Sequence, residues 1–259
     1  MKKSKKNNYY KAIGVTIAII ALLSIVFIFK FGKYYSVSDR TDKIKEKSDY
    51  PVIGWVRVQG TNIDYPVLYA NQEGIDIYDI DVDYSFGWRN VSTDKLNDRT
   101  VVLGHNIRNV SSQPLINEKT FNNFENLPSF LYYDFVKDNK YIQYSVGNNN
   151  YLFKIYSVYM IDSNDFNYGE YLEKSEKRDY IKESKKQSYF DFNVDVKDTD
   201  KLISLVTCTR FYGTTSTSIV VDGRMIRDNE SINNYSVEEN KNYKEIKKIM
   251  EGDDNDEKA

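Results

Sequence analysis

Short runs rich in Val, Ile, Tyr and Phe recur along most of this 259-residue chain, and they limit its possible folds more than any other feature. Such β-branched and aromatic side chains favour strands over helices. The runs occupy 52–58, 62–68, 100–106, 140–146, 151–161, 201–207 and 218–226. Gly60 and Gly147 fall between runs, where a hairpin turn needs positive φ. The pattern predicts one β-rich domain whose strands form a closed or nearly closed barrel.

Two segments depart from the strand pattern and predict peripheral helices. Residues 119–127 carry apolar side chains at helical spacing. Residues 168–186 are highly charged and contain no Gly or Pro after Gly169. Because the second segment has only a thin apolar stripe, we expect its helix to lie on the barrel surface.

An uncharged apolar run at residues 12–29 is long enough for a helix that crosses a bilayer. The lysines that precede it are Lys2, Lys3, Lys5, Lys6 and Lys11. This excess of positive charge predicts a single-pass protein of the cell membrane, with its N-terminus inside and its main domain outside the cytoplasm. A cleaved signal peptide is the alternative, but the run is longer than usual and no small-x-small pattern directly follows it.

Changes in composition divide the chain into five segments. The predicted order is a basic cytoplasmic segment at 1–11, a transmembrane helix at 12–29, a spacer at 30–50, a folded domain at 51–227 and a charged, disordered tail at 228–259. Within the tail, 243–250 is compatible with a short helix. Lys and Arg (36) nearly balance Asp and Glu (38), so the charge does not favour a nucleic-acid partner.

The chain has one Cys and one His, and each follows a strand-like run. Cys208 has no disulfide partner within the chain, so it is either a reactive thiol or a small core residue. A nearby imidazolium would lower the pKa of the thiol and could protonate a leaving amine. His105 fits this role, but a lone His is also typical of an ordinary hydrogen-bonded residue.

The residues around Cys208 and His105 resemble those of one enzyme family. The segment 204–209 reads Ser-Leu-Val-Thr-Cys-Thr, which resembles the Thr-Leu-x-Thr-Cys signature of sortases with Ser for the first Thr. Leu-Gly-His-Asn at 103–106 resembles the segment around the sortase histidine. Class B sortases are similar at 54–55, 60–67 and 88–90 and in the long charged helix before the Cys strand. The resemblance spans residues 51–227.

This resemblance implies a mainly β fold with a closed eight-stranded sortase barrel and a few peripheral helices. It implies a membrane-anchored cysteine transpeptidase whose partners are secreted proteins bearing a C-terminal sorting motif. Cys208 would attack the carbonyl of a Thr in that motif, with His105 as its catalytic partner. An amine of the peptidoglycan would then release the thioacyl enzyme. No metal, nucleotide or other cofactor is expected.

One departure from the family concerns the arginine that sortases carry on the strand after the Cys. In the family this Arg is thought to bind the substrate carbonyl and to stabilise the oxyanion. Ser218 stands at its position here, and a Ser hydroxyl donates a hydrogen bond without a positive charge. Arg210 is either a replacement or a solvent-facing loop charge. Arg224 is discounted, because it lies about 20 Å further along the strand.

Thr207, Leu205 and Asn106 complete the candidate residues for oxyanion or substrate binding. Thr207 neighbours the nucleophile, although a β-branched residue is also typical of a strand. Leu205 belongs to the signature, and Asn106 would either orient the imidazole or cap the following turn. The acidic residues Asp76, Asp79, Asp81 and Asp83 lack the Gly and the final Glu of an EF-hand loop, so we expect a solvated loop and no metal site.

Two other functions remain compatible with the sequence. A hydrolytic cysteine peptidase would use the same thioacyl intermediate and release it with water. A sortase-like binding protein would keep the barrel but be impaired in catalysis, which Ser218 makes plausible. Pilin polymerisation is not expected, because residues 34–50 lack an Asp-Pro-aromatic lid motif and no C-terminal membrane span is visible.

Overall fold

The computed structural model describes residues 51–69, 85–87, 91–106, 123–169, 172–212, 216–232 and 235–251. The predicted membrane helix at 12–29, the spacer at 30–50, the acidic residues at 76–83 and the segment 88–90 lie outside the described residues. Within these ranges, no helix combines the length and the apolar character needed to cross a membrane.

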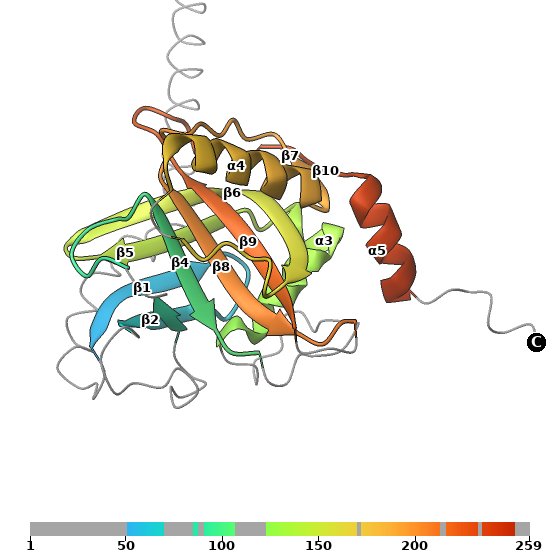
Figure 1. Ribbon diagram of the computed structural model, residues 1–259, viewed down its shortest axis with the longest axis horizontal. Helices are drawn as coiled ribbons and strands as arrows, with labels where there is room; N and C mark the ends of the chain where they lie inside the picture. The colour runs from blue at the N-terminus through green and yellow to red at the C-terminus, as the bar shows by residue number, and fades with distance from the viewer. Residues whose placement is uncertain are drawn as a thin grey trace, which may run out of the picture.

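A closed barrel forms the centre of the fold, with strands hydrogen-bonded in the order β1-β2-β3-β4-β8-β9-β6-β5 (Figure 1). The strands are β1 Val52–Val58, β2 Asp64–Tyr69, β3 Ser85–Gly87, β4 Arg99–Gly104, β5 Tyr141–Val146, β6 Asn149–Asp162, β8 Leu202–Thr209 and β9 Thr217–Met225. The β2–β3 and β4–β8 pairs are parallel and the other pairs are antiparallel. The prediction of a mainly β fold with peripheral helices is confirmed. Gly60 and Gly147 have positive φ in the two predicted turns.

The barrel wall has two buried faces. Alternate side chains of a strand point to opposite faces of the sheet. Leu205 of β8 and Ile219 and Val221 of β9 point into the barrel and belong to its main apolar core. On the outer face, a smaller cluster comprises Val101, Tyr159, Phe166, Val206 and Val220, with Leu103, Ile161 and Tyr168 packed against it. We call this smaller group the outer-face cluster.

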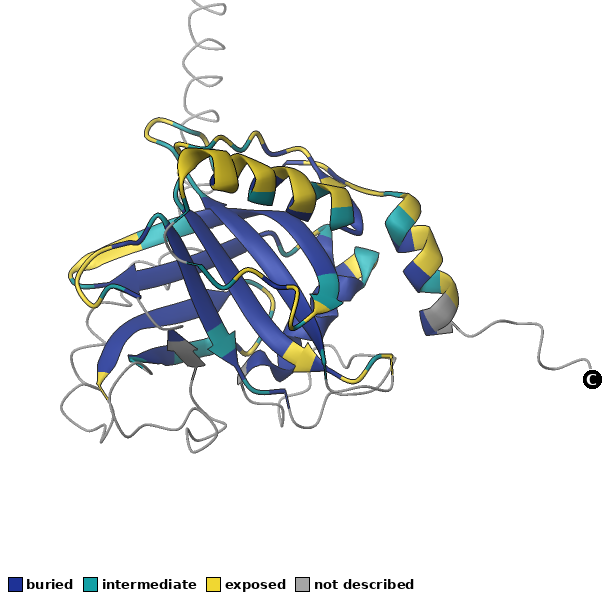
Figure 2. Ribbon diagram, in the orientation of Figure 1, coloured by how far each residue is buried: buried dark blue, intermediate teal, exposed yellow. Residues whose placement is uncertain are grey.

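Helix α4, Lys174–Gln187, lies against the outside of the barrel and contacts β6 (Figure 1). Figure 2 shows its solvent side as exposed and its barrel side as buried. The predicted start of this helix at residue 168 is wrong. The described residues 168–169 and 172–173 are not helical. Arg99 binds the backbone carbonyls of Asn167 and Gly169, and Glu173 and Glu176 form a capping box at the true start.

The helix predicted at 119–127 is a 3₁₀ helix in its described part. This helix, η1, spans Asn123–Leu131 and is followed by the short α-helix α3, Tyr133–Val136. Phe124, Leu127 and Phe130 are fully buried. Their spacing of three residues matches the three residues per turn of a 3₁₀ helix, so all three face the core.

The prediction that the chain is disordered after residue 227 is wrong. Strand β10, Val237–Glu239, pairs with β7, Phe190–Phe192, in a separate two-stranded sheet, and helix α5, Lys241–Glu251, follows. The buried side chains that attach this segment to the main core are Tyr235, Val237, Tyr243, Ile246 and Met250. The short helix considered at 243–250 lies within α5. The folded domain therefore includes residues up to 251.

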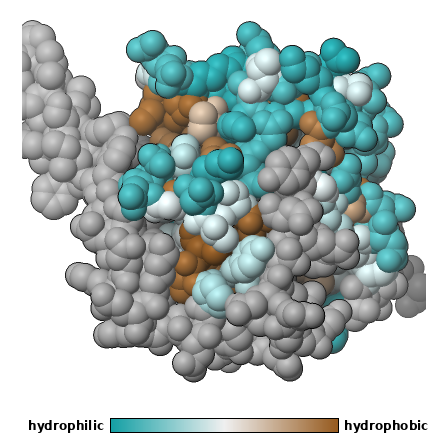
Figure 3. Space-filling model, turned by 60° about the vertical axis from the view of Figure 1, so that its left-hand side comes forward, coloured by the Kyte–Doolittle hydropathy of each residue, from teal (hydrophilic) through white to brown (hydrophobic). Residues whose placement is uncertain are grey.

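On the face turned to the viewer in Figure 3, the described side chains are mostly hydrophilic and surround a few apolar patches. Tyr212, which lies just after β8, is an exposed large hydrophobic residue, with 53% of its surface accessible.

Candidate active site

The parallel pairing of β4 with β8 places His105 next to Cys208. Along this pair, Arg99 is opposite Leu202 and Leu103 is opposite Val206. The same register carried two residues further sets His105 beside Cys208. Neighbouring side chains of parallel strands in register project from the same face. The structure thus brings the chain's only imidazole and only thiol to adjacent positions on the outer face of the barrel.

Two hydrogen bonds fix the His105 segment against β8. The Thr207 hydroxyl donates to the carbonyl of Gly104 at 2.7 Å, and the Asn106 amide donates to the carbonyl of Cys208 at 2.9 Å. These bonds lie on either side of His105, so they hold its backbone alongside the nucleophile. Cys208 is exposed and His105 is half-buried, which leaves the thiol open to a peptide.

The environment of Cys208 favours its neutral form. Although the residue is exposed, the protein atoms around the thiol desolvate it and raise the pKa of Cys208 above its ordinary value. The neutral thiol therefore predominates near pH 7. Because the thiolate is the nucleophile, the reaction needs a group that accepts this proton.

Ser218 lies directly opposite Cys208 in the antiparallel β8–β9 pair. The Ser218 side chain is almost fully buried, and its hydroxyl oxygen lies 2.7 Å from that of Ser163. Burial raises the pKa of Tyr168, the hydrogen bond from Ser218 opposes this shift, and the neighbouring Cys208 adds to it. The structure thus places a pair of serine hydroxyls opposite the nucleophile, and Tyr168 packs on the same face of the barrel.

Three of the predicted site residues do not face the substrate side. Leu205 is fully buried in the main core, so its assignment to substrate binding is wrong. Thr207 is two residues after Leu205 on the same strand, so it points to the same face and is buried. Its hydroxyl donates to the carbonyl of Gly104. Asn106 is buried and binds the Cys208 carbonyl; no described contact shows it capping a turn or orienting the imidazole.

The two arginines considered as replacements differ in their surroundings. Arg224 is buried at the far end of β9, where its guanidinium donates to Glu230 at 2.9 Å. It therefore serves the structure, as expected. Arg210 is exposed just beyond β8 and makes no hydrogen bond or ion pair with the described residues.

A buried polar network lies on the outer face below Cys208. Arg99 donates to the hydroxyls of Ser204 at 3.1 Å and Tyr180 at 2.9 Å. Asp222 accepts from the same two hydroxyls, at 2.6 Å from Ser204 and 2.7 Å from Tyr180. Burial raises the pKa of Asp222, and the Arg99 charge opposes this shift. Ser204, which replaces the first Thr of the signature, therefore has a structural role: its hydroxyl links Arg99 to Asp222.

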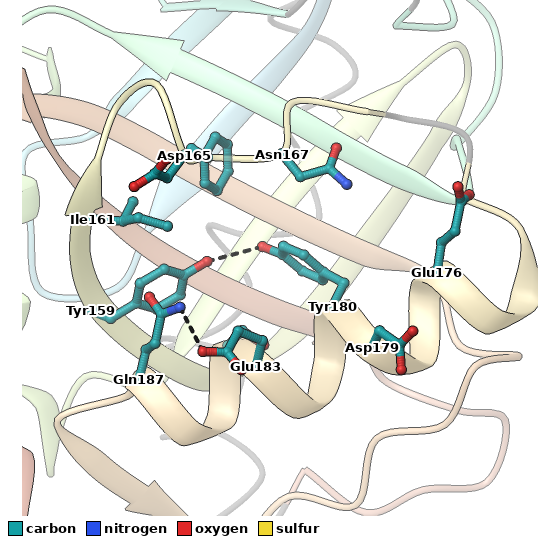
Figure 4. Close-up of a pocket in the computed structure, with 11 residues that line it drawn as sticks. Tyr159, Ile161, Asp165, Asn167, Glu176, Asp179, Tyr180, Glu183 and Gln187 are labelled. Atoms are coloured by element: carbon teal, nitrogen blue, oxygen red, sulfur yellow. Dashed lines mark hydrogen bonds between the residues drawn. The ribbon is translucent and has the colours of Figure 1, made fainter.

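A pocket of about 380 Å³ borders the site between α4, β6 and the loop at 163–169 (Figure 4). Ile161 lines the pocket and is opposite Ser218, which is opposite Cys208 in turn. Figure 4 shows the Tyr159 and Tyr180 hydroxyls pointing toward each other, 3.3 Å apart. The acidic side chains that line the pocket are Asp165, Glu176, Asp179 and Glu183. Within the described ranges, no His, Cys, Asp and Glu side chains group as a metal site.

Sequence reasoning missed Tyr168 and Arg99. The loop at 163–169 has no strand register that could relate Tyr168 to Cys208, and the predicted helix included Tyr168. Arg99 directly precedes a predicted strand, where an arginine is usually solvated. The one available signal was the pair of aromatic residues, Phe166 and Tyr168, in an otherwise polar connection.

Known proteins match this chain over the barrel. A family model described as the sortase domain matches residues 56–226. Sortase B of Listeria monocytogenes serovar 1/2a (strain ATCC BAA-679 / EGD-e) is 27% identical over 194 residues, covering 70% of this chain and 72% of that protein. Sortase B of Staphylococcus aureus (strain NCTC 8325 / PS 47) is 24% identical over 192 residues, covering 70% of this chain and 73% of that protein. The X-ray structure of Clostridium perfringens sortase B has a TM-score of 0.56 and 25% identity, covering 72% of this chain and 99% of that one.

Proposed function

The chain belongs to the sortase family of cysteine transpeptidases, and from this premise we propose that it cleaves a C-terminal sorting signal after Thr and transfers the protein to a cell-wall amine. The likeness to sortase B supports a class B-like enzyme. One observation carries the assignment of the residues: the β4–β8 register sets His105 beside Cys208, and two hydrogen bonds hold that arrangement.

The first half-reaction forms a thioacyl enzyme. The Cys208 thiol loses its proton to the His105 imidazole, and the sulfur forms a bond to the Thr carbonyl carbon of the signal. The peptide bond after Thr then breaks, and its nitrogen leaves as an amine with the proton from His105. This step needs a neutral thiol and a proton acceptor next to each other, which the raised pKa of Cys208 and the position of His105 supply.

The second half-reaction transfers the acyl group. An amine of the cell wall attacks the thioacyl carbon and gives up a proton, a new amide bond forms, and the Cys208 sulfur leaves and is reprotonated. Water in place of the amine would give hydrolysis. The exposure of Cys208 on the outer face of the barrel leaves room for either acceptor.

The proposed location is the outer side of the cytoplasmic membrane, with residues 12–29 as a single-pass anchor. The apolar run and the lysines before it support this topology. Because Cys208 is the only cysteine, a membrane-impermeant maleimide tests it directly. We expect labelling of the full chain in intact protoplasts. Labelling that requires permeabilised cells would contradict the topology.

The activity is tested with the purified domain, a library of Thr-containing peptides and a series of amine acceptors. Wild type should give a thioacyl adduct by intact mass and a ligated product once the amine is added. Cys208→Ala and His105→Ala should each lower turnover by at least about 10⁴-fold, because removing one member of a catalytic unit removes most of its effect. Their free energies of unfolding should stay close to that of wild type.

The same assay separates the alternatives. Cleaved peptide without ligation for every amine would indicate a hydrolase. Absence of both adduct and cleavage across the library would indicate a binding protein, and full activity in Cys208→Ala would exclude the cysteine mechanism.

A further inference from the structure

The pocket of about 380 Å³ between α4, β6 and the loop at 163–169 plays no part in the two half-reactions. We propose that it binds the amine acceptor, by holding a second, positively charged group of that molecule while its reacting amine attacks the thioacyl carbon at Cys208. The inference rests on the transpeptidase function proposed above, and it names the chemical class of the second substrate.

The pocket lies within reach of the nucleophile. Ile161 lines it and is opposite Ser218 in the β6–β9 pair, and Ser218 is opposite Cys208 in the β8–β9 pair. Neighbouring strands are about 4.8 Å apart, so these two steps across the sheet amount to about 10 Å. A peptide covers this distance with three extended residues, since each spans about 3.3–3.6 Å. One acceptor molecule can therefore occupy the pocket and reach the sulfur.

The lining of the pocket suits a side chain with an apolar stem and a charged end. Tyr159, Phe166 and Tyr180 line it together with Ile161. Its volume falls in the range of about 300–1,000 Å³ that small-molecule sites occupy. Aromatic rings attract a cation over their faces, and apolar side chains bury the methylene groups that carry it.

The charge of the lining is of one sign. Its charged side chains are carboxylates, from Asp165 on the loop and from Glu176, Asp179 and Glu183 on α4 (Figure 4). No Lys, Arg or His is among the described residues that line the pocket. A cleft lined by one sign of charge focuses the field and concentrates ligands of the opposite sign. The ligand expected here is therefore a cation.

Two of the four carboxylates are available to a ligand. Glu176 belongs to the capping box of α4, and Glu183 accepts from Gln187 at 3.0 Å. The side chains of Asp165 and Asp179 make no hydrogen bond or ion pair with the described residues. Both residues are exposed, so their replacement should leave the fold intact.

The buried Arg99 guanidinium does not cancel this negative charge. It lies 3.9 Å from the centroid of the Tyr180 ring. Asp222 balances its charge, because Arg99 and Asp222 bind the same two hydroxyls, those of Ser204 and Tyr180. The carboxylates of the lining therefore keep their attraction for a cation from outside.

The charged group in the pocket is distinct from the reacting amine. An amine attacks in its neutral form, whereas nearby carboxylates favour the protonated form. An α-amino group, with a pKa of about 8, is partly neutral near pH 7, and a Lys side chain, with a pKa of about 10.4, stays charged. The acceptor expected combines the two, with the charged group about 10 Å from the reacting amine.

Two acceptor peptides test the proposal: Gly-Gly-Lys amide, and the same peptide with its Lys side chain acetylated. Acetylation removes the charge and keeps the methylene stem. The full chain, purified in detergent, forms the thioacyl adduct with the peptide that it selects from the Thr-containing library, and kcat/KM for the amine reports the transfer. We expect wild type to prefer the charged peptide about tenfold and to join it through its α-amine, which mass fragmentation of the product identifies.

Asp165→Asn/Asp179→Asn removes the two available carboxylates. The preference for the charged peptide should fall to about twofold, because an exposed charge pair contributes only a few-fold and two acidic residues remain. Asp138→Asn/Asp228→Asn is the matched control, since it removes two exposed carboxylates outside the pocket and changes the net charge equally. This control should keep the tenfold preference.

Binding of Gly-Gly-Lys amide to Cys208→Ala provides a readout that does not depend on turnover. Adding Asp165→Asn/Asp179→Asn to this inactive variant should raise the dissociation constant about fivefold, measured by calorimetry at low salt. Adding the control pair should leave the constant within about twofold.

Three results would overturn the role of the pocket while leaving the transpeptidase intact. One is a wild type that forms the adduct but uses the two peptides equally, or uses neither. Another is a preference that survives in Asp165→Asn/Asp179→Asn. The third is a slower formation of the adduct in that variant with the preference unchanged, since the pocket would then hold the sorting signal. If wild type forms no thioacyl adduct at all, the proposed function itself fails, and binding to Cys208→Ala still decides whether the pocket takes the cation.

Discussion

The inside of the barrel and the outer face below Cys208 are both buried, but they are built from opposite kinds of side chain. The interior is apolar, with Leu205, Ile219 and Val221 fully inaccessible. The outer face buries Arg99 and Asp222 to the same extent. Apolar packing tolerates changes that conserve volume. A buried charge tolerates few changes, because each desolvated group needs its own partner in a fixed place.

The difference between the two faces separates stability from positioning. The interior closes the barrel and supplies most of the burial of apolar surface. The Arg99 network adds less apolar burial, yet it reaches from β4 across Ser204 of β8 to Asp222 of β9 and out to the loop that carries Tyr168. The same outer face carries Cys208 at its end. We therefore expect changes on the two faces to affect different measurements.

The largest effect on stability is expected for Arg99→Met, which leaves Asp222 buried without its cation. Breaking such a pair costs about 3–5 kcal/mol, and urea denaturation measures it. The rate of acylation per folded molecule should fall as well, because the carbonyls of Asn167 and Gly169 in the loop beside the site lose their guanidinium donor. In Arg99→Met/Asp222→Asn the loss of stability should be smaller than in Arg99→Met alone. Unchanged acylation in folded Arg99→Met would show that the loop held by Arg99 does not affect the reaction.

Leu205→Ala should also be strongly destabilising, by about 2–5 kcal/mol, because it opens a cavity in the main core. Its acylation rate per folded molecule should stay within about twofold of wild type. Leu205 and Cys208 share strand β8 but point to opposite faces. Leu205→Ala should therefore lower stability and keep activity, whereas Cys208→Ala should keep stability and lose activity. A large loss of activity in folded Leu205→Ala would show that the two faces are coupled.

Alkylation of Cys208 should depend strongly on pH. Because the folded-state pKa of the thiol is raised, the thiolate fraction increases about tenfold per pH unit through neutral and mildly alkaline pH. The rate of reaction with iodoacetamide should therefore still be rising at the pH where urea-unfolded protein has levelled off. A plateau at lower pH in the native protein than in the unfolded protein would show that the site stabilises the thiolate.

The smallest effect is expected for Arg210→Ala. Arg210 is exposed and makes no hydrogen bond or ion pair with the described residues, so acylation should change by less than about threefold. Arg210→Lys is the matched control that keeps the charge. A 100-fold loss in Arg210→Ala would show that Arg210 supplies the donor that Ser218 replaces in the sequence.

Much of this arrangement could be predicted from local sequence. The strand-like runs located the main strands, and the sequence around Cys208 and His105 identified the family. The prediction was wrong about Leu205 because the local sequence does not show which side chains of a strand point into the barrel and which point outward. The tail was misjudged because three buried side chains, Tyr243, Ile246 and Met250, are spread among many charges.

Other features depend on contacts that no local pattern records. The start of α4 at Lys174 follows from hydrogen bonds that Arg99 makes to the preceding loop, and Arg99 is far away in the chain. The position of Tyr168 depends on the same hydrogen bonds, because Arg99 binds the carbonyls on both sides of it. Both features follow from the order in which β4, β8 and β9 lie side by side. The runs of apolar residues in the sequence do not reveal this order.

The insertion of β8 between β4 and β9 has a consequence for biogenesis. Asn106 and the Cys208 carbonyl that it binds are separated by 102 residues, so the closing contact forms late, after a long loop has lost its freedom. An unfolded chain in transit through a membrane would carry its sulfhydryl far from any imidazole. The enzyme would therefore be inactive when it is first synthesised. It would become active only after β8 has paired with β4 and β9.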